Sequence, residues 1–209
     1  MWPSLKGEHW DSVLDRLAAD DFTIIDSFLP QDVLDRIEAT FDAVEAEDRL
    51  HAAKIGHASE EQRISEIRSD YVHWLDRERD LDLEPFFAGI DDLRLAVGRA
   101  MYISLLGYEF HLAKYPPGAF YKAHLDQFDQ RDNRQLSLVI YMNTHWQPGD
   151  GGELKIHGDR PTIVEPLYNR AVLFRSDLVL HEVLIAHKSR RSLTGWLLKR
   201  PSSVAVLGL

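Results

Sequence analysis

The chain has 209 residues, with 24 Lys and Arg against 34 Asp and Glu, a formal net charge of −10 and no cysteine. At about 150 residues per domain, this length predicts one domain with a core that needs no disulfides. The lack of cysteine excludes disulfide frameworks, thiolate zinc sites, iron–sulfur clusters and thiol catalysis. Any metal must therefore be held by histidine and carboxylate. The acidic balance argues against nucleic-acid binding.

The first half of the chain has helical periodicity. A β-branched run at 22–26 precedes Pro30, and apolar residues then recur every three or four positions up to about residue 47. The same pattern predicts a second helix over about 85–105. Between these helices, residues 48–80 are highly charged around one strand-like piece at 67–75. They form either a solvated surface loop or a mobile flap.

The second half alternates short strands with turns rich in Gly, Pro and Asp. Strands are predicted at 108–115, 121–125, 136–142, 154–157, 171–174, 179–183 and 192–198. This pattern predicts a mainly β fold, a jelly-roll (cupin-like) core supported on one face by the two long N-terminal helices. We expect a single domain over 1–209, with residues 1–106 as helical support carrying a charged flap (about 48–80) and 107–200 as the β core.

Three residues of two strands have the chemistry of a metal site. His124 and Asp126 are two positions apart, so in a strand both side chains point to the same face. His181, in a later strand, can supply a third ligand. Two histidines and one carboxylate form the facial triad that leaves open coordination positions on iron(II). Taken alone, this pattern is a weak signal, because a His-x-Asp pair arises by chance in many chains, and a polar strand edge is the more common explanation.

A buried cation is predicted next to this site. Arg190 shares strand parity with Ser192, Thr194 and Trp196, so it points inward on an otherwise apolar strand. An unpaired buried charge is costly, and a bound dicarboxylate would pair with its guanidinium bidentately. Tyr141 can donate a hydrogen bond to the same group. A metal beside a carboxylate clamp is suited to a 2-oxo acid that chelates the metal at one end.

At this point the sequence resembles a known family, the 2-oxoglutarate- and iron(II)-dependent dioxygenases. It is most similar to their prolyl 4-hydroxylase branch, which includes the oxygen-sensing (hypoxia-inducible factor type) hydroxylases and bacterial homologues. The resemblance covers roughly residues 65–200. The motifs that carry it are Ile67-Arg68-Ser-Asp70 with Trp74, Tyr115-Pro-Pro-Gly, His124-Leu-Asp126, Tyr141-Met-Asn143, Gly151-Gly-Glu-Leu154, His181-Glu-Val, and Arg190 with Thr194-Gly-Trp196.

The resemblance implies a double-stranded β-helix core, and it assigns roles to individual residues. His124, Asp126 and His181 would bind iron(II) and form the catalytic centre. The 2-oxoglutarate would be bound by Arg190, Tyr141, Tyr115 and Thr194. The substrate-binding residues would be Arg68, Asp70, Arg134 and Trp196, with Asp70 and Arg134 pairing to tie the substrate-covering segment to the core. Val183 and Leu198 would join Trp196 in walling the pocket.

The same resemblance implies the reaction. Iron(II), 2-oxoglutarate and O2, with ascorbate as a reductant, would hydroxylate a prolyl residue of a protein, and 2-oxoglutarate would become succinate and CO2. Elongation factor Tu is the first candidate substrate. Three alternatives are a free amino acid or other small molecule as substrate, a non-catalytic β-fold metal-binding module, and a zinc hydrolase. We expect a cytoplasmic protein that binds no membrane, because the sequence has neither a long apolar run nor a signal-peptide core.

Overall fold

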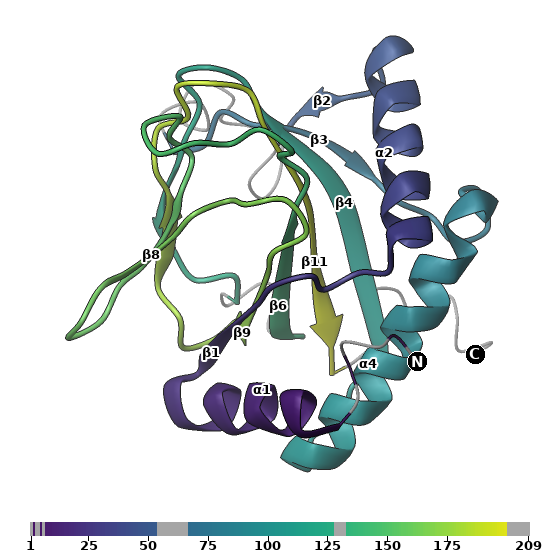
Figure 1. Ribbon diagram of the computed structural model, residues 1–209, viewed down its shortest axis with the longest axis vertical. Helices are drawn as coiled ribbons and strands as arrows, with labels where there is room; N and C mark the ends of the chain where they lie inside the picture. The colour runs from purple at the N-terminus through teal and green to yellow at the C-terminus, as the bar shows by residue number, and fades with distance from the viewer. Residues whose placement is uncertain (1, 3–4, 6, 54–66, 128–132, 200–209) are drawn as a thin grey trace.

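The computed structural model describes residues 2, 5, 7–53, 67–127 and 133–199. Their strands form two antiparallel sheets that face each other (Figure 1). The seven-stranded sheet has the order β1 (Phe22–Ile25), β9 (Ala171–Arg175), β6 (Arg134–Tyr141), β11 (Arg190–Leu198), β4 (Gly107–Tyr115), β3 (Tyr71–Trp74) and β2 (His51–Ala52). The four-stranded sheet has the order β5 (Tyr121–His124), β10 (His181–Val183), β7 (Leu154–Ile156) and β8 (Thr162–Val164). This arrangement is consistent with the expected double-stranded β-helix.

The central strands of the large sheet are buried on both faces, and their two sets of side chains have different roles. On β11, Leu193 and Leu197 pack toward the helices, whereas Arg190 and Trp196 face the space between the sheets. Because side chains alternate along a strand, one nine-residue segment thus supplies both core and cavity lining. The polar residues of the core strands consequently gather on the inner face of the large sheet.

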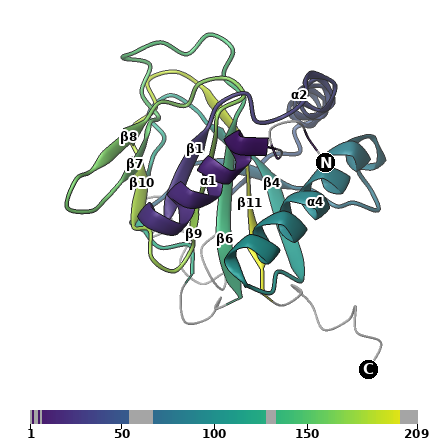
Figure 2. The same cartoon turned by 60° about the horizontal axis from the view of Figure 1, so that its bottom comes forward.

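Three helices cover the outer face of the large sheet (Figure 2). The predicted helices are α2 (Gln31–Ala46) and α4 (Glu84–Met101), and their apolar stripes are buried. The third helix, α1 (Gly7–Asp20), was not predicted; its buried residues are Trp10, Val13 and Leu17. Trp2 and Trp10 are each 6% exposed and belong to this core.

Most predicted strands are present with ends shifted by one or two residues. The short strands β2 and β8 were not predicted, and a 3-10 turn, Leu81–Leu83, precedes α4. The expected flap at about 48–80 falls partly on residues 54–66, which lie outside the described residues. Within the described part, this segment contributes β2 and β3 to the edge of the large sheet. Among the described helices, none is long and apolar enough to span a bilayer.

Candidate active site

The two sheets bring His124, Asp126 and His181 together, as the spacing predicted. His124 ends β5, and His181 begins β10 directly opposite it. The Nε2 atom of His124 lies 3.5 Å from Oδ1 of Asp126, and Nε2 of His181 lies 3.7 Å from its Oδ2. One potential ligand atom from each residue lies within 4.8 Å of the others. The three groups therefore form a compact donor set of the kind that binds a divalent metal.

Both imidazoles are oriented by backbone carbonyls. Nδ1 of His124 lies 2.8 Å from the carbonyl oxygen of Lys122, and Nδ1 of His181 lies 3.0 Å from that of Val179. A carbonyl oxygen only accepts, so each Nδ1 carries the proton and each Nε2 presents a lone pair toward Asp126. Burial also lowers the pKa of His181, which keeps this ring neutral and available as a ligand.

Asp126 is held as an ionised carboxylate. Burial alone would raise its pKa, but His181 and His124, when protonated, and the donating hydroxyl of Ser137 lower it. Ser137 donates to Oδ2 of Asp126 at 2.6 Å, and its Oγ lies 2.8 Å from Oγ of Ser176. The large sheet thus positions, through Ser137, a carboxylate that follows a strand of the small sheet.

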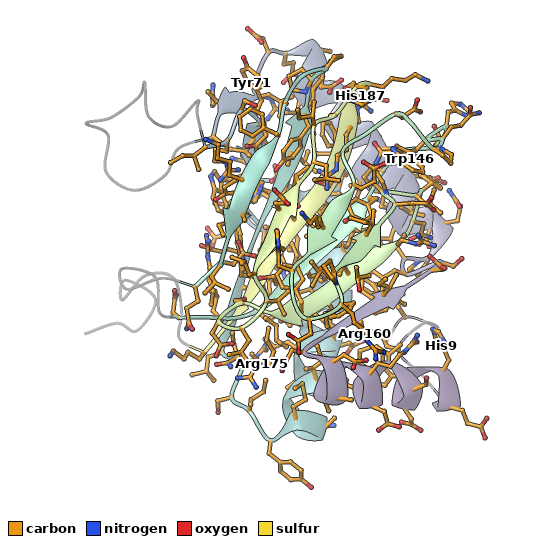
Figure 3. All side chains as sticks on the ribbon, turned by 90° about the vertical axis from the view of Figure 1, so that its left-hand side faces the viewer. His9, Tyr71, Trp146, Arg160, Arg175 and His187 are labelled. Atoms are coloured by element: carbon orange, nitrogen blue, oxygen red, sulfur yellow. The ribbon has the colours of Figure 1, made fainter. Side chains whose placement is uncertain are left out.

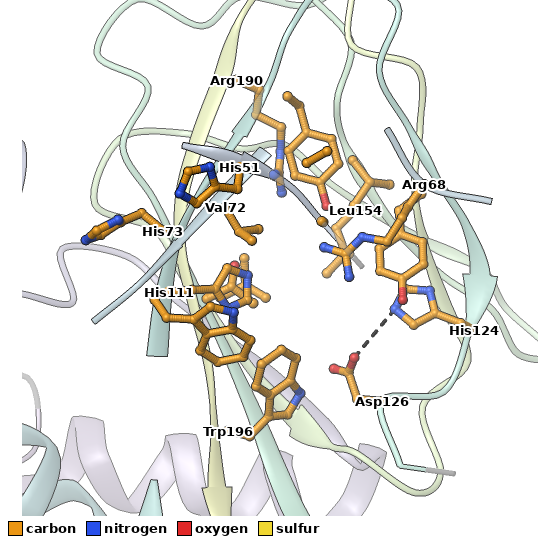
Figure 4. A pocket seen from close by; sticks show the side chains of 18 of the residues that line it. His51, Arg68, Val72, His73, His111, His124, Asp126, Leu154, Arg190 and Trp196 are labelled. Atoms are coloured by element: carbon orange, nitrogen blue, oxygen red, sulfur yellow. Dashed lines mark ion pairs between the residues drawn. The ribbon is translucent and has the colours of Figure 1, made fainter. Parts of the chain in front are cut away.

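The donor set opens into a cavity of about 580 Å³ between the sheets. Arg190 lies across this cavity from His124 and Asp126 (Figure 4). It is 2% exposed, and its Nη1 donates to Oγ of Ser192 at 3.2 Å. Its Nε has no hydrogen-bond partner in the part of the chain that the structure describes, and neither does the buried hydroxyl of Tyr141.

These two unpartnered groups fit a carboxylate. The guanidinium carbon of Arg190 lies 4.7 Å from the ring centroid of Tyr115 and 5.0 Å from that of Tyr141. Burial raises the pKa of both phenols, so each keeps its proton as a donor. A charged fork beside a phenolic donor, with no carboxylate paired to it among the described residues, is complementary to an anionic ligand. A metal held by the triad would lie across the same cavity from this anion site.

One segment, residues 67–70, connects the two sheets beside the triad. Arg68 forms an isolated bridge with Tyr121, and its guanidinium lies 4.4 Å from the centroid of that ring. The Tyr121 ring in turn stacks on His124 at 3.6 Å. Arg68 also forms a bidentate ion pair with the buried Asp70, at 2.7 and 2.6 Å. We call residues 67–70 the strap.

The expected pairing of Asp70 with Arg134 is wrong. Asp70 pairs with Arg68, because residues two apart in an extended segment project to the same side. Arg134 instead pairs with Glu109 at 2.7 Å, and its guanidinium carbon lies 3.3 Å from the centroid of Trp196. Asp70 therefore anchors the strap, and Arg134 supports a cavity wall.

The structure brings nearly all of the predicted site residues to this one cavity. Those that line it are Arg68, Tyr115, His124, Asp126, Arg134, His181, Val183, Arg190, Thr194 and Trp196. Tyr141 lies fully buried near Arg190, Asp70 is buried against Arg68, and Leu198 is not among the lining residues.

His111, which was not predicted from the sequence, also lines the cavity. It lies in β4, two strand repeats before Tyr115, so shared parity with Tyr115 was the one available signal. His187, six residues after His181, is exposed and lies at the edge of the molecule (Figure 3). Its Nδ1 lies 2.9 Å from the carbonyl oxygen of Gly149, and it is not part of the donor set.

Comparison with known proteins agrees with this geometry. Residues 110–198 match the family model described as the 2OG-Fe(II) oxygenase superfamily. A prolyl-4-hydroxylase from Pseudomonas putida is 38% identical, with a TM-score of 0.80, and the alignment covers 91% of this chain and 98% of that one. The chain belongs to this oxygenase superfamily.

The oxygenase is of the prolyl 4-hydroxylase type, a dioxygenase that uses iron(II), 2-oxoglutarate and O2. Its fold is also that of a Trichoplax adhaerens prolyl hydroxylase, solved with a peptide of the hypoxia-inducible factor. That protein is 22% identical, with a TM-score of 0.79, and the match covers 94% of this chain and 96% of that one. A Phytophthora capsici prolyl 4-hydroxylase shares the fold at 20% identity, with a TM-score of 0.72, over 100% of this chain and 75% of that one.

Proposed function

We propose that this oxygenase hydroxylates a prolyl residue of a protein substrate in the cytoplasm. His124, Asp126 and His181 would hold iron(II), and Arg190 with Tyr141 would bind the distal carboxylate of 2-oxoglutarate. The observation that carries the co-substrate assignment is the buried Arg190, whose Nε lacks a partner opposite a three-residue donor set. Neither a binding module nor a zinc hydrolase requires such a group.

When bound, iron(II) with 2-oxoglutarate and O2 supplies the oxidation of a C–H bond to an alcohol, and 2-oxoglutarate is converted to succinate and CO2. The contribution of the chain is orientation and exclusion of water. Backbone carbonyls fix the two imidazoles, Ser137 fixes the carboxylate, and Tyr115 and Thr194 would line the co-substrate. Arg68 and Trp196 line the same cavity and would contact the substrate.

A polypeptide substrate is favoured by two observations. The 38% identical relative is a prolyl-4-hydroxylase. Trp74, which lines the cavity, is 43% exposed. Exposed aromatic side chains beside a cavity are typical of surfaces that bind another chain. Elongation factor Tu is the first candidate, since the motifs are similar to those of the bacterial prolyl hydroxylases.

The test is oxygen transfer to a defined residue. The protein, with iron(II) and 2-oxoglutarate, is incubated with purified elongation factor Tu and, separately, with a library of proline-containing peptides. We expect a prolyl residue to gain one oxygen atom, located by fragment mass spectrometry, with one succinate formed per hydroxylation. Oxygen gain by free L-proline alone would replace the protein substrate with a small molecule. Succinate formation without any hydroxylated proline would contradict the prolyl assignment.

A further inference from the structure

Three aromatic rings form one wall of the cavity, and we call Trp74, His111 and Trp196 the aromatic shelf. The rings come from adjacent strands, since His111 of β4 lies opposite Trp74 of β3. The centroid of His111 is 4.9 Å from that of Trp74 and 5.4 Å from that of Trp196. All three residues line the cavity, and Figure 4 shows His111 and Trp196 on the same side of it.

The shelf contains polar atoms with no partner. His111 and Trp196 are 4% and 6% exposed, yet neither Nδ1 of His111 nor Nε1 of Trp196 makes a hydrogen bond within the described residues. Buried polar atoms are normally paired, so an unpartnered pair at a cavity wall indicates a ligand that completes it. The indole Nε1–H can only donate. Burial lowers the pKa of His111 to about 3, so its imidazole is neutral and one of its nitrogens also donates.

Neighbouring side chains restrict the orientation of the shelf. The guanidinium of Arg134 lies 3.3 Å from the centroid of Trp196, and Glu109 holds that guanidinium by an ion pair at 2.7 Å. His111 stacks on Trp196 at an interplanar angle of 28°. With Arg134 and His111 both packed against it, the indole is not free to turn its N–H toward another partner. Its preorganised donor is suited to a ligand that enters the cavity.

The shelf lies toward the metal end of the cavity. On β11, Trp196 is six strand residues from Arg190, and the position paired with His111 is four residues from it. Trp196 also lies opposite Ser137, which donates to Asp126. The shelf therefore borders the metal site, at the end of the cavity away from the backbone of Arg190.

We propose that His111 and Trp196 donate hydrogen bonds to backbone carbonyl groups of the polypeptide substrate next to its target proline. This inference rests on the proposed function. A prolyl nitrogen carries no hydrogen, so the backbone around a target proline is rich in acceptors and poor in donors. Two donors and a flat apolar surface are complementary to such a segment. His111 is thereby a specificity-determining residue for the substrate.

The test compares two substitutions of similar size. His111→Leu keeps an apolar side chain but removes the donor, and His111→Gln restores an amide donor. We expect His111→Leu to raise the KM for the hydroxylated peptide, or for elongation factor Tu, about tenfold, which is the loss of one hydrogen bond. His111→Gln should recover most of that loss. The 2-oxoglutarate concentration that half-saturates the visible band of the anaerobic iron(II) complex should stay within about twofold in both variants.

The outcomes separate this inference from the proposed function. A wild-type protein that hydroxylates no polypeptide overturns both. An active wild type with an unchanged peptide KM in His111→Leu overturns the donor role of His111 alone. A shift in 2-oxoglutarate half-saturation without a change in peptide KM would assign His111 to the co-substrate instead. Urea unfolding of each variant establishes that the kinetic change is measured on folded protein.

Discussion

At the scale of single residues, Arg190 couples co-substrate affinity to a cost in stability. It is a buried cation whose Nη1 donates to Ser192, and it has no carboxylate partner among the residues described. A buried charge without a partner destabilises the folded protein, whereas the same charge strengthens the binding of an anionic ligand. The free energy of unfolding of the ligand-free protein is therefore reduced by this charge, and bound 2-oxoglutarate would restore it.

Arg190→Met is expected to separate these two effects. Loss of charge-assisted hydrogen bonds should raise the half-saturating 2-oxoglutarate concentration about 10- to 100-fold, measured by the visible band of the anaerobic iron(II) complex. Removal of the unpaired charge should raise the free energy of unfolding of the ligand-free protein by about 1–2 kcal/mol, measured in urea. Tyr141→Phe is the milder control. Unchanged 2-oxoglutarate binding in Arg190→Met would contradict the proposed role of Arg190 in binding the distal carboxylate.

Side-chain positions that follow from alternation within one strand could be predicted from the sequence, whereas contacts that depend on tertiary structure could not. The parity of His124 with Asp126, and of Arg190 with Trp196, follows from strand geometry, so these residues were predicted to converge. The partner of Asp70 was predicted wrongly, because the choice between Arg68 and Arg134 depends on how the strap crosses β5, a tertiary feature. His111 was missed because a single histidine in a strand has no distinctive spacing.

At the scale of elements, the strap contains one buried ion pair, between Arg68 and Asp70. The side chain of Asp70 is 0% exposed and that of Arg68 is 13% exposed. We expect Asp70→Asn to lower the free energy of unfolding by about 2–3 kcal/mol, because it leaves the Arg68 charge buried without its partner. The double variant Arg68→Met/Asp70→Leu should regain most of this, since both charges are then absent. Equal losses in the single and double variants, measured in urea, would contradict this account.

A second element-scale prediction concerns the contact between the N-terminus and α4. A Cβ atom added at Gly89 would lie 1.9 Å from Cε2 of Trp2, which packs against Phe28 and Phe86. Gly→Ala in a helix normally stabilises by up to about 1 kcal/mol. Here we expect a loss of about 1–3 kcal/mol, because the Trp2 ring must move.

The matched control for Gly89→Ala is a Trp2→Ala background. There the clash is absent, so adding Gly89→Ala should be neutral or stabilising as helix propensity dictates. Urea unfolding of the four proteins gives the coupling energy directly. A coupling energy near zero between the two substitutions would show that the Trp2 ring does not pack against Gly89.

The elements that the sequence did not predict are those with little periodicity to read. Strand β2 spans two residues, too short for alternation to be recognised, whereas β8, with three residues, is as long as β7 and β10, which were predicted. Helix α1 does have buried residues at helical spacing, Trp10, Val13 and Leu17, but these three positions span little more than two turns. By contrast, the buried stripes of α2 and α4 each extend over about three turns, which was enough to predict both helices.

At the scale of the whole molecule, buried histidines make stability depend on pH. Burial lowers the pKa of His111 to about 3, and it also lowers that of His181. In the unfolded chain a histidine titrates near about 6.5. Between about pH 6.5 and about pH 3 the unfolded state therefore binds more protons than the folded state. Stability is retained above this window and falls as pH falls through it.

His111→Leu measures the contribution of this one group. Between pH 7 and pH 5 the wild type should lose about 2 kcal/mol more free energy of unfolding than the variant, at about 1.4 kcal/mol per pH unit for one proton. Urea titrations at the two pH values, without iron or 2-oxoglutarate, provide the comparison. Parallel losses in both proteins would show that His111 takes up a proton in the folded state.

The aromatic shelf has an optical consequence. Trp74 and Trp196 lie 6.1 Å apart on the cavity wall, and Trp74 is the more exposed of the two. A chain that settles on this wall removes water from the Trp74 indole, and the intrinsic emission of the protein then shifts to shorter wavelength. Replacing Trp74 by Phe would erase that signal while Trp2, Trp10 and Trp146 stay in place. Tryptophan fluorescence should therefore report binding of a polypeptide in the cavity without an added label and before any turnover takes place.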